Sequence, residues 1–335
     1  MDLEADHRLE RGHGLIVVRT GADKRGVRRA ILLTVTALIA VSAACVAPRG
    51  PEAPARLPDR IRVRVGDAVV ALPIEDYVAG TILAEVSPVT ETTATAERIF
   101  EVQAIVARTY AARHLGRHRA EGFDVCDTTH CQIYDGARLK TSRFAAIART
   151  AAARTRGRVL VYGGRVADAL FHADCGGATA AADSVWGGAP VPYLLARPDD
   201  IGATHRTWSV NVERDRLRNM LDADPRSDIG QRLDNVEVRQ RDASGRAATV
   251  ALSGELTKLV RGEDFRAILN RVLGDRALQS TRLTVTRRGT AFAFAGSGFG
   301  HGVGLCQVGA AARARRGDSV EQILAAYYPG TALSR

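Results

Sequence analysis

The residue best placed for acid–base chemistry is Glu85, near the end of the stretch 73–88. Proline at both ends of this stretch predicts a helix that begins at Pro73 and ends before Pro88. One face of that helix carries Ile74, Tyr77, Val78, Thr81, Ile82 and Glu85. A carboxyl group on such an apolar face is poorly solvated, which raises its pKa and lets it hold and donate a proton near neutrality.

An ion pair is the alternative role for Glu85. A second helix is expected over 96–114. Its own small and apolar residues occupy nearly the whole circumference of the helix, so it should be central to its domain. Arg108 on this helix needs a partner if it is buried. Glu85 would then be a structural residue, and its spacing alone does not separate the two roles.

A cluster of metal-binding residue types follows within 14 residues: His118, Cys126, His130 and Cys131. Two thiols and two imidazoles form a tetrahedral zinc set. Their spacing matches no standard zinc finger. A Cys126–Cys131 disulfide is a second possibility, natural outside the cytoplasm, and free thiols are a third.

Two further stretches combine histidine with glycine. His172 and Asp174 share one face of an expected strand that runs into Gly176 and Gly177, where the default interpretation is a tight structural turn. His301 lies in the glycine-rich loop 296–304, which enters a helix at about residue 306. Such a helix start can receive an anion or a substrate oxygen, but the GK[ST] ending of a phosphate loop is absent.

The elements that must position these groups are short and local. Four β-hairpins are expected within 61–72, 158–175, 235–254 and 282–296, with about six helices between and after them. Because the strands come in local pairs and not as βαβ units, the expected fold class is α+β. Folded structure is expected over 61–335, with a second lobe or insertion at about 205–280 in which the sequence offers no chemistry.

The N-terminal region has the layout of an export signal. Residues 1–29 are polar and end in basic residues, the apolar run 30–47 ends in small residues, and 48–60 is a Pro- and Arg-rich linker. Cys45 offers a lipid attachment point, although Ser42 stands where a lipoprotein motif usually has Leu or Val. An uncleaved membrane anchor is the other possibility. In each case the segment 1–29 is a cytoplasmic or leader region and the folded part lies outside the cytoplasm.

Composition narrows the class of partner. The chain has 335 residues, of which 46% are hydrophobic, so it is globular and long enough for a substantial core. Its net charge of +10 suits an anionic partner, which includes nucleic acid, membrane or an anionic wall polymer. Aromatic residues make up only 5%, and zinc-finger or arginine-rich helix patterns are absent from the sequence, which argues against nucleic acid.

Five sequence blocks, in this order, carry a family resemblance: EDYVAGTILAEVSP; VQAIVARTYAARH; DTTHCQIYDG; FHADCGGAT with VWGGAPVPYL; and GFGHGVGLCQVGA with ILAAYYPGT. They resemble the stage II sporulation protein D family, also called SpoIID/LytB, from about residue 61 to the C-terminus. The departures are Val86-Ser87 where Met-Pro is frequent, the Thr-rich loop 89–95, and Cys306 where Ser is common.

This resemblance implies an exported lytic transglycosylase that cuts peptidoglycan glycan strands between MurNAc and GlcNAc. Glu85 would be its single acid/base, leaving a 1,6-anhydro-MurNAc end. A subset of the family has a zinc cage that matches His118, Cys126, His130 and Cys131, and four protein ligands would make that zinc structural. No organic cofactor is expected. Residues expected to bind substrate are Gln132, Tyr134, His172, Gly176, Gly177, Thr179, His301 and Gln307.

The resemblance leaves other roles and partners open. Some family members are described as modifiers of cell-wall amidases, so the alternative is a glycan-binding or amidase-modifying protein that does not cut. A purely structural envelope protein is a third possibility. Expected partners are glycan strands, a cell-wall amidase and, through the N-terminal segment, the membrane. Cys175 and Cys306 lie in two of the blocks, and whether they pair is open, as is the setting in sporulation or general wall turnover.

Overall fold

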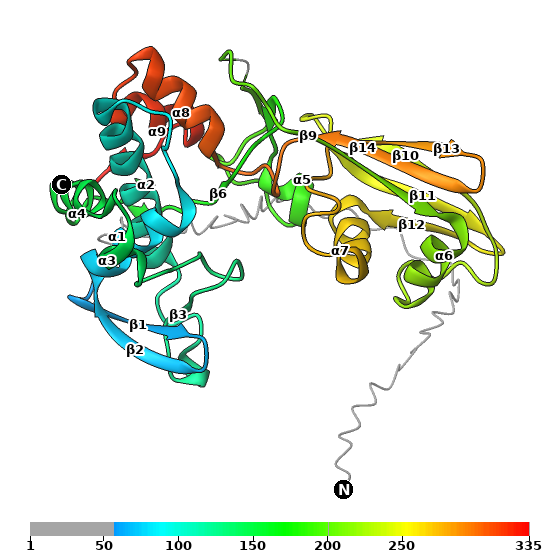
Figure 1. The fold of residues 1–335 in the computed structure, drawn as a ribbon, viewed down its shortest axis with the longest axis horizontal. Coiled ribbons are helices and arrows are strands. Elements are labelled where there is room, and N and C mark those ends of the chain that lie inside the picture. The colour runs from blue at the N-terminus through cyan, green and yellow to red at the C-terminus, as the bar shows by residue number, and fades with distance from the viewer. Residues whose placement is uncertain (1–56, 200, 335) are drawn as a thin grey trace, which may run out of the picture. The chain divides into compact units, whose positions relative to one another are not determined.

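The computed structural model describes residues 57–199 and 201–334 (Figure 1). The expected segments 1–29 and 30–47, the latter with Cys45, and most of the linker 48–60 lie outside the described residues. Within the described part of the chain, no helix is both long enough and apolar enough to cross a membrane.

The described ranges contain nine α-helices, more than the six or so expected. They are α1 (Ile74–Glu85), α2 (Thr93–Arg113), α3 (Arg138–Thr141), α4 (Ala145–Arg154), α5 (Ala182–Trp186), α6 (Arg214–Asp222), α7 (Gly262–Leu273), α8 (Gln307–Arg316) and α9 (Val320–Tyr327), with a 3₁₀ helix η1 (Arg119–Glu121). The unexpected α3 and α5 have four and five residues, too few to show a helical period in the sequence.

The strands are mostly short. They are β1 (Arg60–Val65), β2 (Ala68–Pro73), β3 (Val125–Cys126), β4 (Leu160–Tyr162), β5 (Arg165–Val166), β6 (Phe171–His172), β7 (Ala178–Thr179), β8 (Arg197–Pro198), β9 (Thr207–Glu213), β10 (Leu233–Arg241), β11 (Ala247–Gly254), β12 (Thr257–Arg261), β13 (Leu283–Arg288), β14 (Ala291–Ser297), β15 (Leu305–Cys306) and β16 (Ala332–Leu333). The four expected hairpins are the antiparallel pairs β1–β2, β4–β5, β10–β11 and β13–β14. The α+β class is confirmed.

The Thr-rich stretch 89–95 was expected to be a loop, but its last three residues belong to a helix. The side chain of Thr92 accepts a hydrogen bond from the backbone N–H of Thr95, so α2 begins at Thr93. A threonine in this position satisfies an N–H group that the first turn of a helix leaves without a partner. The polar composition of the stretch therefore reflects a helix cap as well as a surface loop.

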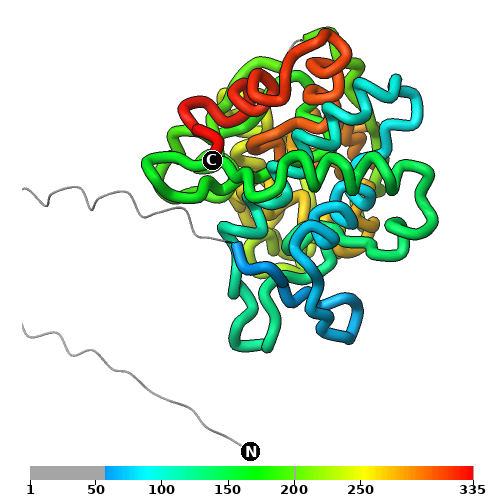
Figure 2. Tube along the Cα trace, turned by 90° about the vertical axis from the view of Figure 1, so that its left-hand side faces the viewer, coloured from blue at the N-terminus to red at the C-terminus, as the bar shows by residue number. Residues whose placement is uncertain are grey.

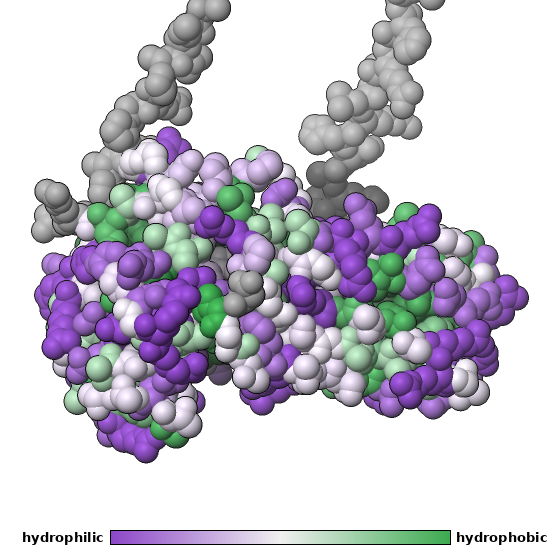
Figure 3. Space-filling model, turned by 90° about the horizontal axis from the view of Figure 1, so that it is seen from above, coloured by the Kyte–Doolittle hydropathy of each residue, from purple (hydrophilic) through white to green (hydrophobic). Residues whose placement is uncertain are grey.

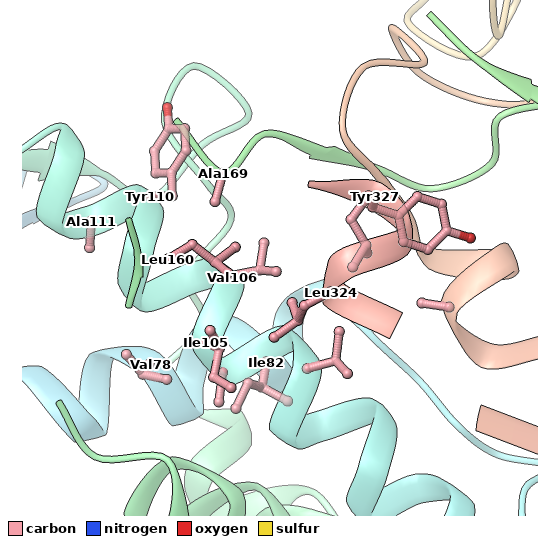
Figure 4. Packing of buried hydrophobic residues seen from close by; sticks show 14 of the residues in the cluster. Val78, Ile82, Ile105, Val106, Tyr110, Ala111, Leu160, Ala169, Leu324 and Tyr327 are labelled. Carbon is pink, nitrogen blue, oxygen red and sulfur yellow. The ribbon is translucent and has the colours of Figure 1, made fainter. Parts of the chain in front are cut away.

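One hydrophobic core surrounds α2, and it holds the elements that position the site. Val78 and Ile82 of α1, Ile105 of α2 and Leu324 of α9 belong to this core (Figure 4). The helix α4 packs against both α1 and α2 (Figure 2), and its buried face consists of alanines, whose small side chains allow close approach. As predicted, α2 is the central helix of its core.

A second hydrophobic core contains residues from Trp208 to Phe294. It is built on two three-stranded sheets, ordered β10–β11–β12 and β13–β14–β9, and on the helices α6 and α7. The strand β14 pairs with β13 and with β9, so this core continues past residue 280. Hydrophilic side chains (purple) cover much of the face shown in Figure 3.

Candidate active site and sulfur clusters

Glu85 is the last residue of α1, and its side chain is partly buried. Its Oε1 accepts a hydrogen bond from the backbone N–H of Ile133, 2.8 Å away. Burial removes water from the carboxylate and raises the pKa of Glu85 to about 7, although the Ile133 N–H opposes the rise. A carboxyl group with this pKa is present in both protonated and ionised forms at neutral pH.

Arg108 does not pair with Glu85. Its fully buried guanidinium binds Glu75, with Nη2 2.5 Å from Oε2 and Nε 3.3 Å from Oε1. Among the described residues, Glu85 forms no ion pair. The ion-pair alternative for Glu85 is therefore wrong, because the guanidinium is held at the first turn of α1 and the carboxyl group lies at its last.

Gln132 and Tyr134 flank the Ile133 N–H and hold its segment against the helices. The amide nitrogen of Gln132 donates to the Tyr77 hydroxyl at 2.8 Å and to the Ala107 carbonyl at 3.1 Å. The ring of Tyr134 stacks on that of Tyr77, with 5.5 Å between centroids. Both side chains expected to bind substrate are buried, and both contact the helices that carry or support Glu85. Ile133 was not predicted, because it acts through its backbone N–H and any residue type could supply that group.

His118, Cys126, His130 and Cys131 meet, as their clustering predicted. Cys131 Sγ lies 3.5 Å from His118 Nε2 and 3.9 Å from His130 Nδ1, and Cys126 Sγ lies 3.7 Å from His130 Nδ1. The segment is fixed partly by β3, whose Cys126 pairs in parallel with β1. The alternative interpretation, a Cys126–Cys131 disulfide, is wrong, because both thiols are free.

The geometry of this cluster fits zinc. A tetrahedron with zinc–sulfur bonds of about 2.3 Å and zinc–nitrogen bonds of about 2.0 Å has edges of roughly 3.3 to 3.8 Å, and its sulfur–nitrogen edges of about 3.5 Å are close to the observed separations. Nδ1 of His118 lies 2.6 Å from the Glu121 carboxylate, which leaves Nε2 facing Cys131. A carboxylate behind a histidine ligand is a common feature of metal sites. Glu121 was not predicted, although its place three residues after His118 was a usable signal.

His172, His301 and Trp186 form a second group of contacts. The ring centroid of His301 lies 5.1 Å from that of Trp186 and 5.5 Å from that of His172. Burial, and then the positive charge of Arg246, lowers the pKa of His301 to about 4, and burial lowers that of His172 as well. Both imidazoles are therefore neutral at pH 7. Trp186 is 47% exposed, so this group reaches solvent through an aromatic ring.

The remaining predicted residues have different surroundings. Gly176 has φ of +73°, and a Cβ there would lie 2.8 Å from Ser297 Oγ, so this turn needs glycine. Gly177 also has positive φ. Thr179 is buried and donates to the Leu195 carbonyl at 2.9 Å, closing a loop. Gln307 is the first residue of α8, and its buried Nε2 has no hydrogen-bond partner within the described ranges.

Cys175 and Cys306 are close but form no disulfide. The thiol of Cys175 donates to Asp199 Oδ2 at 3.4 Å, and Cys306 Sγ accepts from the backbone N–H of Cys175 at 3.2 Å. Asp199 also accepts from the Tyr327 hydroxyl at 2.8 and 3.0 Å. Nothing local in the sequence marks Asp199, because it follows a two-residue strand in a loop.

Two segments match known families. Residues 65–162 match the family described as stage II sporulation protein (SpoIID), and residues 202–304 match a domain of unknown function, DUF8618. The second match falls largely on the second core. The helix with Glu85 and the four residues of the His–Cys cluster all lie inside the first match.

Relatives match over most of the chain. It is 28% identical over 283 residues to stage II sporulation protein D of Bacillus subtilis, covering 80% of this chain and 76% of that protein. It is 33% identical over 266 residues to an uncharacterized protein of Brachyspira hyodysenteriae, covering 77% of this chain and 66% of that protein. It is 28% identical over 278 residues to the amidase enhancer of Bacillus subtilis, covering 70% of this chain but only 38% of that protein.

The fold and the site define an α+β protein in which a partly buried carboxyl group, with no cationic partner among the described residues, lies close in sequence to a His–Cys cluster whose residues other than His130 are buried. The chain belongs to the stage II sporulation protein D family.

Proposed function

We propose that this protein is a lytic transglycosylase that cuts peptidoglycan glycan strands between MurNAc and GlcNAc, with Glu85 as its single acid/base. The observation that supports this best is the state of Glu85: a partly buried carboxyl group with pKa about 7, one backbone N–H donor and, within the described part of the chain, no cation beside it. Such a group can donate a proton and take one back at the same pH.

The proposed reaction needs no second carboxylate. Protonated Glu85 gives its proton to the glycosidic oxygen as the bond to C1 of MurNAc breaks. The 6-hydroxyl oxygen of the same MurNAc then bonds to C1, and its proton passes to the Glu85 carboxylate. The products are a free 4-hydroxyl and a 1,6-anhydro end, and Glu85 is protonated again. A hydrolase would instead need a pair of carboxylates set about 5 to 9 Å apart.

His118, Cys126, His130 and Cys131 would hold a structural zinc ion, which would crosslink the loop that carries the Ile133 N–H. Four protein ligands leave no open position for a reacting water. Removing metal with a chelator should then lower the melting temperature more than it lowers the rate per folded molecule. Loss of activity with an unchanged melting temperature would contradict a structural role and indicate a catalytic metal.

Replacing Glu85 with Gln tests the proposal directly. Purified protein is incubated with glycan strands, with and without stem peptides, and products are analysed by mass spectrometry. We expect wild type to release anhydro-muropeptides, and Glu85→Gln to release none while keeping its circular dichroism spectrum. Glu97→Gln, which changes a surface carboxyl group on α2, is the matched control and should keep full activity. Activity retained in Glu85→Gln would refute the assignment.

A second candidate function is a non-cutting role at the wall, as a glycan-binding protein or an amidase modifier. The match to a protein named amidase enhancer favours it. In this case the wild-type protein would co-sediment with strands, yield no anhydro ends, and raise the rate of an added cell-wall amidase. The Glu85→Gln variant would then behave like wild type in both assays.

We also propose that the folded part lies outside the cytoplasm, exported or anchored through residues 30–47. The leader-like pattern of this segment and the family membership support this placement. Protease treatment of intact spheroplasts should degrade a C-terminally tagged protein. Protection of the tag until the membrane is lysed would contradict it.

A further inference from the structure

We propose that His172, Cys175 and Cys306 form a second metal site, built for a thiophilic divalent cation of the zinc type and separate from the His118 cluster. One ligand atom from each of the three residues lies within 4.8 Å of the others. All three residues are buried, with exposed fractions of 4%, 0% and 0%. Two thiols and an imidazole are soft donors that select such a metal.

The tertiary fold brings these donors together from distant segments. Strands β6 and β15 pair in parallel, with Cys306 opposite His172 in the register. Cys175 lies three residues after the end of β6. Its backbone N–H donates to Cys306 Sγ, which keeps Cys175 close to the other two residues. His172 and Cys306 therefore lie on paired strands, and Cys175 and Cys306 belong to the main core.

His172 has the arrangement of a metal ligand. Its Nδ1 lies 3.1 Å from the Val303 carbonyl and donates to it, which leaves a lone pair on Nε2. That Nε2 is buried and has no hydrogen-bond partner among the residues that the structure describes. Buried polar atoms are rarely left unsatisfied, and histidines that bind metals commonly donate their other ring N–H to a backbone carbonyl. A cation bound at Nε2 accounts for both observations.

Both sulfur atoms accept backbone N–H groups. Cys306 Sγ accepts from Cys175 at 3.2 Å and from Gly309 at 3.3 Å, and Cys175 Sγ accepts from Gly177 at 3.3 Å. These backbone contacts hold the two sulfur atoms in fixed positions beside each other. Cys306 also caps the N-terminus of α8, where the helix dipole favours negative charge.

Asp199 is a carboxylate beside Cys175, outside the group of three donors that share one centre. Its Oδ2 lies 3.4 Å from Cys175 Sγ, and it is 2% exposed. Two thiolates, one carboxylate and a divalent cation leave a net charge of −1. Arg313 Nη2 lies 3.5 Å from Asp199 Oδ1, and Arg246 donates to the Cys175 carbonyl at 2.9 Å, so two cations stand beside that charge. The two guanidinium groups therefore compensate the net negative charge that the site would have with a cation bound.

Metal content of the full-length protein tests this proposal without any assay of catalysis. Protein is purified with zinc under reducing conditions, and bound metal per chain is measured by inductively coupled plasma mass spectrometry. We expect about two ions in wild type, about one in Cys131→Ser, about one in Cys306→Ser and none in the double variant. Serine has the size of cysteine and its oxygen accepts the same N–H bonds, so Cys306→Ser should fold.

Cobalt substitution gives a second readout that leaves Cys175 and Cys306 intact. The Cys131→Ser variant, loaded with Co²⁺, should still show thiolate-to-cobalt charge transfer and visible bands of a tetrahedral ion. Absence of these bands would overturn the proposal, as would equal metal content in wild type and Cys306→Ser. Non-reducing peptide mass spectrometry that found a Cys175–Cys306 disulfide, two hydrogens lighter than the dithiol, would overturn it too.

Discussion

Arg108 binds the Glu75 carboxylate at the first turn of α1, whereas Glu85 at the last turn of the same helix accepts a hydrogen bond from the Ile133 N–H and pairs with no cation in residues 57–199 and 201–334. Two glutamates ten positions apart thus have opposite surroundings. Glu75 is neutralised by a buried guanidinium, whereas Glu85 loses water without gaining a cation. The difference gives the first a structural role and leaves the second free to exchange a proton.

Removing Arg108 should strongly destabilise the fold. Arg108→Met leaves a carboxylate without its cation in a largely buried position, and breaking such a pair costs about 3 to 5 kcal/mol. Urea unfolding followed by circular dichroism measures the change. Arg154→Met, which breaks exposed pairs with Glu97 and Glu101, is the control and should cost far less, because water and salt screen exposed ion pairs. Equal losses in the two variants would contradict the assigned role of Arg108.

The stability of the protein relative to Glu85→Gln should depend on pH. The pKa of Glu85 rises from 4.5 to about 7 on folding, so the folded state binds more protons in between. The contribution of Glu85 to stability is therefore fully present below pH 4.5 and is lost as pH rises to about 7.

This loss should amount to about 3 kcal/mol, since one pKa unit is worth about 1.4 kcal/mol. Urea unfolding of both proteins at several pH values measures it, because groups that they share cancel in the difference. A difference in the free energy of unfolding that stays constant from pH 4 to pH 8 would show that the carboxyl group is well solvated.

Activity should follow the same ionisation. If protonated Glu85 starts the reaction, kcat/KM should be level at acid pH and fall about tenfold per pH unit above pH 7. Initial rates of anhydro-end formation at low substrate concentration give this profile. A rate that increases with pH through this range would mean that the ionised form reacts first.

Glu121 should strengthen metal binding at the His118 cluster without touching the ion. In Glu121→Gln the Nδ1–H of His118 loses a charged acceptor, and losses of such partners weaken affinity by about 10- to 100-fold. Competition with a chromophoric chelator measures this affinity, and Glu97→Gln serves as the control. An unchanged affinity would show that His118 is oriented by other contacts, such as its stacking on Phe123.

Gly80 should be required by the ring of Tyr134. A Cβ at residue 80 would overlap that ring, so Gly80→Ala in wild type should cost about 1 to 3 kcal/mol. In the Tyr134→Ala background the same change should stabilise by up to about 1 kcal/mol, because alanine favours a helix interior. Urea unfolding of wild type, the two single variants and the double variant completes a double-mutant cycle. If Gly80→Ala lowered the free energy of unfolding equally in both backgrounds, the steric conflict would involve a residue other than Tyr134.

Local sequence patterns predicted most of the secondary structure. Prolines predicted the ends of α1, turn residues predicted four hairpins, and alternating polarity predicted their strands. These predictions were possible because each signal lies within a few neighbouring residues. The short helices α3 and α5 and the parallel pairs β1–β3 and β15–β6 had no such signal. Parallel pairing joins segments that are distant in the chain, so the residues next to Val125 or Leu305 do not predict which strand pairs with them.

By itself, the sequence determined which side chains with useful chemistry are present: a carboxyl group on an apolar helix face, and thiols and imidazoles within one short stretch. The tertiary structure alone decided their partners. In the folded chain Arg108 forms an ion pair with Glu75, the Ile133 N–H donates to Glu85, and Cys306 lies beside His172 and Cys175. The physical reason is that solvation, charge pairing and ligand geometry depend on distances in space, which chain folding sets across separations of up to 134 residues.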